Sequence, residues 1–387
     1  MSRKLVGLAA GFAALSLVAI PVASASSDLR KAPPTRAQTV ELRGSNLTGG
    51  DWFGYTTAIS GNTIAVGAPY HPGGGRVYVF HRSGSAWKQV QVLRGSDTTA
   101  NDVFGVDVKV SGSELIIGAD QAHGTGRAYI FVNTGGRWKQ AAELGASDLT
   151  AGLHYGLSVA ISGSNAIVGT EDDNHAYIYH KSGSHWKQSA EFSGTGQFGF
   201  WVGISGATAV VGADENSAKA PNAGAIYVYS LSGPTWKPSG RLTGTDTAAS
   251  DHFGQNLAIS GGTIVVNAPY HAHSAGRIYV FTKIARKWKE TAELVGSKVK
   301  QADTFGWYVA ISGGSIVAGT PQWQDPGTGK AYVFTGSGRH WKAVAILEAN
   351  NLTAHDQFGA GVGISGGTAV VGAYTHVGGG AAYVFHV

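Results

Sequence analysis

Aromatic and histidine side chains recur at one place in this sequence, at the end of or shortly after triplets such as Gly67-Ala68-Pro69. Rings in such positions can stack on a sugar or a protein surface, and an imidazole beside them can donate or accept a hydrogen bond. Scattered aromatic residues at turns are the plainer interpretation. The candidate ligand-binding residues of this group are Tyr70, His71, Tyr270, His271, Trp323 and Tyr374.

Carboxylates occupy the third position of the same triplet in three consecutive copies, where three other copies have proline. We interpret them as an acidic notch for a cationic group or a bound cation; carboxylates that cap turns on a solvated rim are the alternative. Because they belong to different copies, we expect them to lie too far apart to share one ion. The candidate residues of the notch are Asp120, Glu171, Asp172, Asp173, Asp214 and Glu215.

No linear motif for catalysis or metal binding accompanies these residues. The chain has no cysteine, which excludes thiol catalysis and zinc–thiolate sites. No serine lies in a Gly-x-Ser-x-Gly elbow, and His271 and His273 alone lack the spacing of a zinc site. We therefore predict no catalytic residue, no metal and no cofactor.

Seven copies of one repeat carry the candidate residues. Each copy has an aromatic residue followed by glycine, and the triplet begins 14 residues after that aromatic residue in every copy. Such a fixed interval predicts an array of similar structural units. The pairs are Phe53-Gly54, Phe104-Gly105, Tyr155-Gly156, Phe198-Gly199, Phe253-Gly254, Phe305-Gly306 and Phe358-Gly359.

Each repeat predicts four short β-strands bounded by glycine and serine turns. In the first copy they span residues 55–59, 63–68, 76–80 and 87–93. We expect an all-β, seven-bladed β-propeller of four-stranded antiparallel blades over residues 38–387. The repeats begin with Val40-Glu41-Leu42, which matches the end of a fourth strand, and the chain ends with a third strand. The N-terminal strand is therefore predicted to close the ring.

The two faces of such a propeller differ. The connections between strands 1 and 2 are serine-glycine turns in all seven copies, and those between strands 3 and 4 have a constant length. All variation in length falls in the 2–3 connections and the 4–1 connections between blades, which emerge on the opposite face. Variable loops on a rigid frame are the usual place for binding groups, so we expect the 2–3 and 4–1 loop face to bind the ligand. Trp201, Trp307 and Tyr308 lie on predicted innermost strands near one mouth of the axis. They could line a pocket there, and we favour the alternative that they plug the axis.

The aromatic-glycine pairs and the triplets that follow them resemble the FG-GAP repeat, the unit of the integrin α-subunit head propeller and of many exported bacterial proteins. The resemblance extends from about Gln38 to the C-terminus and implies the propeller fold; it does not specify a function. Integrin-type blades often carry an Asp-x-Asp-x-Asp-Gly calcium loop between strands 1 and 2. Here that connection reads Ser60-Gly61-Asn62 in the first copy and lacks a carboxylate in all seven, so calcium binding is not implied.

The N-terminus predicts export. Residues 1–25 have the basic start, the apolar run and the small residues at 23 and 25 that are typical of a cleaved signal peptide. Residues 26–37 are predicted to form a polar linker. Cleavage would remove Arg3 and Lys4 and lower the formal charge from +5 to +3, too weak a bias for nucleic acid. We expect a secreted monomer without a membrane anchor once the signal is removed.

These observations favour a secreted, non-catalytic interaction or adhesion module that binds an extracellular protein or a glycan through the loop face. The alternative is a glycan-active enzyme, a lyase or glycosidase, that uses carboxylates near the propeller axis. A propeller can bring residues of different blades together, so the lack of a linear motif leaves this alternative open.

Overall fold

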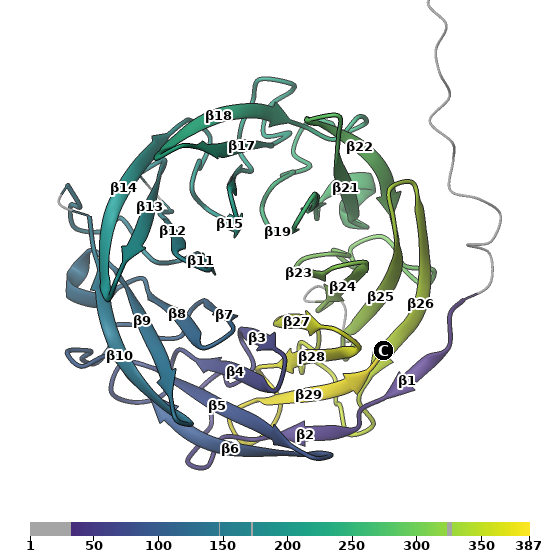
Figure 1. Ribbon diagram of the computed structural model, residues 1–387. Helices are drawn as coiled ribbons and strands as arrows, with labels where there is room; N and C mark the ends of the chain where they lie inside the picture. Colours follow the sequence, from purple (N-terminus) through teal and green to yellow (C-terminus); the bar gives the residue numbers. More distant parts are fainter. Residues whose placement is uncertain (1–31, 147, 172, 323–326) are drawn as a thin grey trace, which may run out of the picture.

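The computed structural model describes residues 32–146, 148–171, 173–322 and 327–387, and these residues form seven β-sheets arranged around one axis (Figure 1). Each sheet is one blade of a propeller, which confirms the predicted fold. Blade 1 contains β3 (Thr57–Ser60), β4 (Thr63–Ala68), β5 (Arg76–Ser83) and β6 (Ala86–Leu93). Blade 2 contains β7 (Val108–Ser111), β8 (Glu114–Ala119), β9 (Arg127–Thr134) and β10 (Arg137–Leu144). Blade 3 contains β11 (Val159–Ser162), β12 (Asn165–Gly169), β13 (His175–Ser182) and β14 (His185–Ser193).

The remaining blades repeat this plan. Blade 4 contains β15 (Val202–Ser205), β16 (Thr208–Ala213), β17 (Ala225–Ser232) and β18 (Thr235–Leu242). Blade 5 contains β19 (Leu257–Ser260), β20 (Thr263–Ala268), β21 (Arg277–Ile284) and β22 (Lys287–Leu294). Blade 6 contains β23 (Val309–Ser312), β24 (Ser315–Thr320), β25 (Lys330–Ser337) and β26 (His340–Glu348). Blade 7 contains β27 (Val362–Ser365), β28 (Thr368–Ala373), β29 (Ala381–His386) and β2 (Val40–Leu42).

The N-terminal strand β2 closes the ring, as predicted. It pairs antiparallel with β29 in the register Val40 to Val384 and Leu42 to Ala382, so it supplies the fourth strand of blade 7. The Leu42 side chain is buried in the cluster between blades 7 and 1. Closure by the far end of the chain covers an edge strand that would otherwise be open to pairing with other chains.

The end of the predicted linker is not a plain linker. Its last three residues form β1 (Thr35–Ala37), which runs parallel to the outer strand β26 of blade 6. All three residues are exposed. The segment therefore adds a fifth strand to blade 6 outside the ring (Figure 1) and buries little apolar surface.

Two repeated aromatic residues, one from the aromatic-glycine pair and one from the third strand, pack on each other inside every blade. The ring of Phe53 meets the ring of Tyr78 edge to face, with centroids 5.3 Å apart, and both residues are fully buried. The equivalent pairs of the other six blades have centroids between 5.3 and 5.8 Å apart. Seven buried apolar clusters then join neighbouring blades, so each sheet depends on its neighbours for its core.

The glycine at the first position of the triplet sets the distance between blades. A Cβ atom added to Gly118 would collide with the carbonyl oxygen of Gly156, the glycine of the next aromatic-glycine pair. Gly67 has the same relation to Gly105, and Gly372 to Gly54 across the closure of the ring. Backbone of adjacent blades can approach this closely only where no side chain intervenes.

The serine-glycine turns between strands 1 and 2 link neighbouring blades on the face opposite the 2–3 and 4–1 loops. Ser60 Oγ accepts a hydrogen bond from the backbone N–H of Gly112 at 3.3 Å, and Ser260 Oγ accepts from Gly313 at 3.1 Å. Three further links of this kind join Ser162 to Gly206, Ser205 to Gly261 and Ser365 to Gly61. These turns therefore have a structural role between blades.

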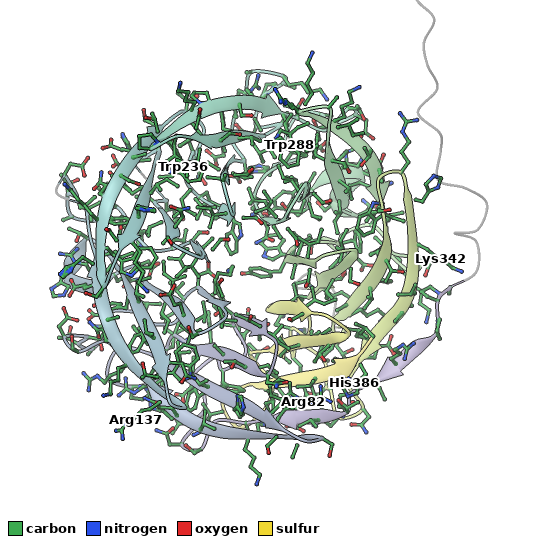
Figure 2. The ribbon with its side chains drawn as sticks, viewed as in Figure 1. Arg82, Arg137, Trp236, Trp288, Lys342 and His386 are labelled. Atoms are coloured by element: carbon green, nitrogen blue, oxygen red, sulfur yellow. The ribbon has the colours of Figure 1, made fainter. Side chains whose placement is uncertain are left out.

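The outermost strands carry the repeated tryptophans. Figure 2 shows Trp236 on β18 and Trp288 on β22, and both side chains are buried in clusters with the preceding blade. The lysine that follows each tryptophan, such as Lys342 on β26, lies on the circumference (Figure 2). Within the described residues, no helix is long and apolar enough to cross a membrane. The predicted signal peptide lies outside these residues.

Candidate functional site

A pocket of about 820 Å³ lies on the 2–3 and 4–1 loop face, over blades 4 and 5. Glu171 comes from the 2–3 loop of blade 3, Asp214 and Glu215 come from that of blade 4, and Tyr270 and His271 come from that of blade 5. Residues of segment 248–255, the connection from blade 4 to blade 5, form another wall, and Gln197 and Phe200 line the pocket from the connection between blades 3 and 4. Five of the twelve predicted ligand-binding residues thus meet at one pocket, although they belong to three blades.

The other predicted residues lie elsewhere. Asp120 is buried beside His154, and Asp173 lies 3.2 Å from His175. Tyr70 and Tyr374 join an aromatic cluster on blades 1 and 7, and His71 is buried below it. Asp172 and Trp323 lie outside the described residues.

The pocket is acidic. Glu171, Asp214, Glu215 and Asp251 all line it, and among the described lining residues none is lysine or arginine. A ligand group with positive charge is therefore the chemistry that this lining would attract.

Asp214 pairs with a histidine of the next blade. Nδ1 of His252 lies 3.1 Å from Oδ2 of Asp214, and this hydrogen bond raises the pKa of His252, although burial opposes the shift. The second oxygen of Asp214 is buried and has no hydrogen-bond partner among the described residues. A buried carboxylate oxygen in that state costs free energy unless a donor reaches it.

The same arrangement occurs between blades 2 and 3. Oδ2 of Asp120 lies 3.4 Å from Nδ1 of His154, and its second oxygen is buried without a partner among the described residues. Burial raises the pKa of Asp120 to about 6; His154 opposes the shift, and the charge of Glu171 adds to it. Both aspartates occupy the same position in their repeats, and both histidines directly precede the aromatic residue of the next repeat.

The residue directly before the aromatic-glycine pair has an unusual backbone conformation in every blade. All seven residues have positive φ although none is glycine, with values between 50° and 61°. Non-glycine residues adopt this conformation at a cost that the surrounding structure must offset. They are Trp52, Val103, His154, Gln197, His252, Thr304 and Gln357. This set of seven residues was not predicted from the sequence, where its only signal is the fixed position before each aromatic-glycine pair.

The blade 5 wall of the pocket is a left-handed turn. Element α1 (His271–Ser274) has positive φ at Ala272 (53°), His273 (59°) and Ser274 (62°). Blade 1 places Gly73 and Gly74 in the corresponding part of its loop. Non-glycine residues pay roughly 1–2 kcal/mol each for this conformation, so blade 5 holds side chains at the pocket where glycine would be less strained.

A second group of aromatic rings covers the axis end of blades 1 and 7. Trp52 meets Tyr70 edge to face at 4.4 Å and Tyr374 at 4.8 Å between centroids. Tyr70 remains half exposed. This cluster could support a flat apolar surface of a ligand, but it lies on different blades from the pocket.

The histidines after the triplet act chiefly as tethers. Nδ1 of His71 lies 2.7 Å from Oδ2 of Asp51, and the same contact joins His271 to Asp251 at 2.8 Å and His376 to Asp356 at 2.7 Å. Each aspartate also accepts a backbone hydrogen bond inside its 4–1 loop, as in Thr48 N–H to Asp51 at 2.8 Å. These aspartates therefore hold their turns, and the histidines extend that role across two loops.

The propeller axis contains a smaller cavity of about 220 Å³. Trp201 of blade 4 and Tyr308 of blade 6 line this cavity and meet edge to face, with ring centroids 5.8 Å apart. Lys109 projects into it, forms an ion pair with the buried Asp107 and lies 5.6 Å from the centroid of Trp201. The loop face also has one 3₁₀ turn, η2 (Ala122–Gly124), in blade 2.

The family model of the FG-GAP repeat matches this chain seven times. The matches cover residues 37–80, 87–131, 138–185, 192–229, 236–281, 288–334 and 341–385. They span most of the sequence, so the chain belongs to the FG-GAP repeat family. Each match begins at the outermost strand of one blade and extends to the third strand of the next, so the sequence repeat is offset from the blade by one strand. No curated protein matches the sequence.

Among solved structures, the chain is similar to a protein from Lactobacillus plantarum whose crystal structure was determined by a structural genomics consortium. The two chains share 11% sequence identity with a TM-score of 0.52, and the match covers 76% of this chain and 86% of the other. A likeness at this identity supports the propeller fold alone.

Proposed function

We propose that this chain is a secreted, non-catalytic binding protein whose pocket over blades 4 and 5 takes a cationic group of an extracellular partner. A lysine or arginine side chain of a protein suits the pocket best, and a glycan with free amino groups offers the same charge. The observation that carries the proposal is the acidic pocket itself, in which carboxylates from loops of neighbouring blades line one space with no lysine or arginine among the described lining residues.

Two features of the pocket support a binding role. Asp214 keeps a buried oxygen for which a donor on the ligand would provide the missing hydrogen bond. The aromatic wall of the pocket is Tyr270, whose ring centroid lies 5.2 Å from that of His252 and 5.9 Å from that of Trp307, both edge to face. Cationic groups bind well between carboxylates and aromatic faces.

The test is a comparison of pocket variants in a glycan array and a pull-down from the surroundings of the producing cells. The double variant D214N/E215Q should bind the captured protein or glycan at least about tenfold more weakly than the original chain. The matched control is D173N/E191Q, which removes two carboxylates from the outer rim of blade 3 and should bind normally. Equal binding by D214N/E215Q and the control would refute the pocket as the binding site.

One observation favours the enzymatic alternative. Asp120 is a buried carboxyl whose pKa of about 6 suits a general acid, and the charge of Glu171 influences it. Incubation with polysaccharides distinguishes the two functions, because only an enzyme releases products. Loss of product release in D120N would assign the catalytic role to Asp120.

A further inference from the structure

Two clusters on the outer rim of the loop face each bring an aspartate, a histidine and a glutamate together. They are Asp97, His123 and Glu143 on blade 2, and Asp246, His271 and Glu293 on blade 5. In each cluster the three potential ligand atoms lie within 4.8 Å of one another. We propose that both clusters bind a divalent transition-metal ion of the zinc class, one ion per cluster.

The blade 5 cluster is oriented by neighbours that hold each ligand. His271 directs Nδ1 to the buried Asp251 at 2.8 Å, which leaves Nε2 facing Asp246 Oδ2 at 3.6 Å. Metal-bound histidines usually donate their other ring N–H to a carboxylate in this way. Tyr279 OH donates to Oδ1 of Asp246 at 2.6 Å, so Oδ2 is the oxygen turned to the histidine.

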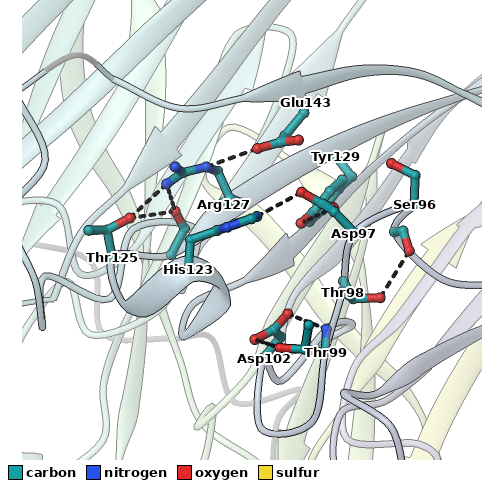
Figure 3. Close-up of polar contacts among 12 residues, drawn as sticks. Ser96, Asp97, Thr98, Thr99, Asp102, His123, Thr125, Arg127, Tyr129 and Glu143 are labelled. Atoms are coloured by element: carbon teal, nitrogen blue, oxygen red, sulfur yellow. Dashed lines mark hydrogen bonds and ion pairs between the residues drawn. The ribbon is translucent and has the colours of Figure 1, made fainter.

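The blade 2 cluster has an equivalent supporting tyrosine and arginine (Figure 3). Tyr129 OH donates to Oδ1 of Asp97 at 2.9 Å, and Oδ2 of Asp97 lies 2.7 Å from Nε2 of His123. Arg127 Nε donates to Oε1 of Glu143 at 2.9 Å, as Arg277 does to Glu293 at 2.7 Å on blade 5. Each glutamate therefore keeps Oε2 for an ion.

The two histidines reach equivalent places from different loop positions. His271 lies four residues after Asn267, the first residue of its triplet, whereas His123 lies five residues after Gly118. His123 also has positive φ, at 55°, within the turn η2. Two loops of different construction thus deliver the same ligand type beside the same aspartate and glutamate positions.

Blade 1 shows that the tethering role of the histidine does not require the outer ligands. His71 keeps its contact with Asp51, but Asn46 stands where blade 5 has Asp246, and Val92 stands where it has Glu293. Nε2 of His71 faces the amide nitrogen of Asn46 at 3.4 Å. Blade 1 therefore offers a matched site with the histidine but without the two carboxylates.

The ligand set selects the class of ion. One imidazole nitrogen and two carboxylate oxygens suit zinc and cobalt, which accept mixed nitrogen and oxygen ligands in four-coordinate sites. Calcium needs six to eight oxygens, which neither cluster provides. The fourth position of the ion would face solvent on the rim. The proposal does not depend on the proposed function, because the blade 2 cluster lies outside the pocket.

The experiment uses the full chain without a histidine tag, treated with a chelator and dialysed. Calorimetric titration with Zn²⁺ and visible absorption with Co²⁺ should each report two equivalents. H123A and H271A should each lose one equivalent, H123A/H271A should lose both, and H71A and the exposed-site variant H81A should retain both. E293Q should weaken one site at least about tenfold.

Three results would overturn the proposal. They are no saturable Zn²⁺ binding, unchanged stoichiometry in H123A/H271A, and equal binding of Ca²⁺. In the first case the clusters are ion-pair networks neutralised by Arg127 and Arg277. Circular dichroism of each variant separates loss of a ligand from loss of the fold.

Discussion

The buried carboxylate of Asp51 lies 2.7 Å from Nδ1 of His71 and so joins the loop before blade 1 to the loop between its second and third strands. Asp51 also accepts hydrogen bonds from the backbone N–H and the hydroxyl of Thr48, both at 2.8 Å. One carboxylate thus holds three groups of the loop face. The same contact recurs in blades 5 and 7, so one type of tether joins the loops of three blades.

Removal of this tether should destabilise the protein. D51A leaves three donors without their acceptor, and we expect a loss of about 2–3 kcal/mol in the free energy of unfolding. H71A should cost about half as much. The exposed histidine variant H81A should change stability by less than about 0.5 kcal/mol. Denaturant unfolding measures all three, and equal midpoints for D51A and H81A would contradict the assignment.

Closure of the ring should depend on β2 and not on β1. A chain that begins at Gln38 lacks the exposed β1 and should melt within about 2 °C of the longer chain. A chain that begins at Arg43 also lacks β2, leaves the edge of β29 open and uncovers the cluster around Leu42, so its melting temperature should fall by about 10 °C or more. Scanning calorimetry compares the two chains. Equal melting would show that the N-terminal strand does not lock the ring.

Asp120 should make the stability depend on pH. Its folded pKa of about 6 exceeds the ordinary value of 3.8, so between pH 4 and 6 the folded state binds more protons than the unfolded state. The original chain should therefore lose stability as the pH rises through this window. D120N removes the buried charge and should be more stable at pH 7 by about 2–3 kcal/mol, with the advantage vanishing near pH 4.

Unfolding midpoints of the D120N variant and the original chain between pH 4 and 8 measure the difference. A destabilised D120N at pH 7 would instead mean that the contact with His154 outweighs the burial of the charge. D173N, at a partly exposed position, is the control and should show no such dependence.

The left-handed turn of blade 5 should lower the stability of the protein, because it holds non-glycine side chains at the pocket in a strained conformation. H273G relieves a residue with φ of 59° and should stabilise the protein by about 0.5–1 kcal/mol. Ligand binding should weaken, because His273 lines the pocket. Thermal unfolding and the pull-down assay give the two readouts. A less stable H273G would contradict the presence of strain at this turn.

The fold could be predicted from the sequence because the repeated marks are the packing contacts themselves. Phe53 and Tyr78 meet edge to face in the blade, and Gly67 lies against Gly105 of the next one, so their spacing in the sequence follows from the geometry of the blades. The closing strand followed from an incomplete last repeat. The short strand β1 gave no such signal, since its pairing depends on three exposed residues.

The site could be predicted only in part. The acidic residues Asp120 and Asp214 were found from their repeat position, but their partners His154 and His252 come from the following blades. Contacts of this kind depend on how one blade is rotated against the next, which linear spacing does not record. For the same reason the Asp246, His271 and Glu293 cluster has no recognisable ligand motif in the sequence.

The absence of cysteine from the chain allows the most direct measurement of the binding site. A249C places one thiol on the pocket wall, and S85C places one on an exposed turn of the opposite face. Each variant carries a photoactivated crosslinker on that thiol and is exposed to the natural surroundings of the protein. We predict that A249C captures a defined partner, that excess unlabelled original chain but not D214N/E215Q prevents the capture, and that S85C captures none. Capture of the same partner by S85C alone, or by both variants alike, would contradict a binding site over blades 4 and 5.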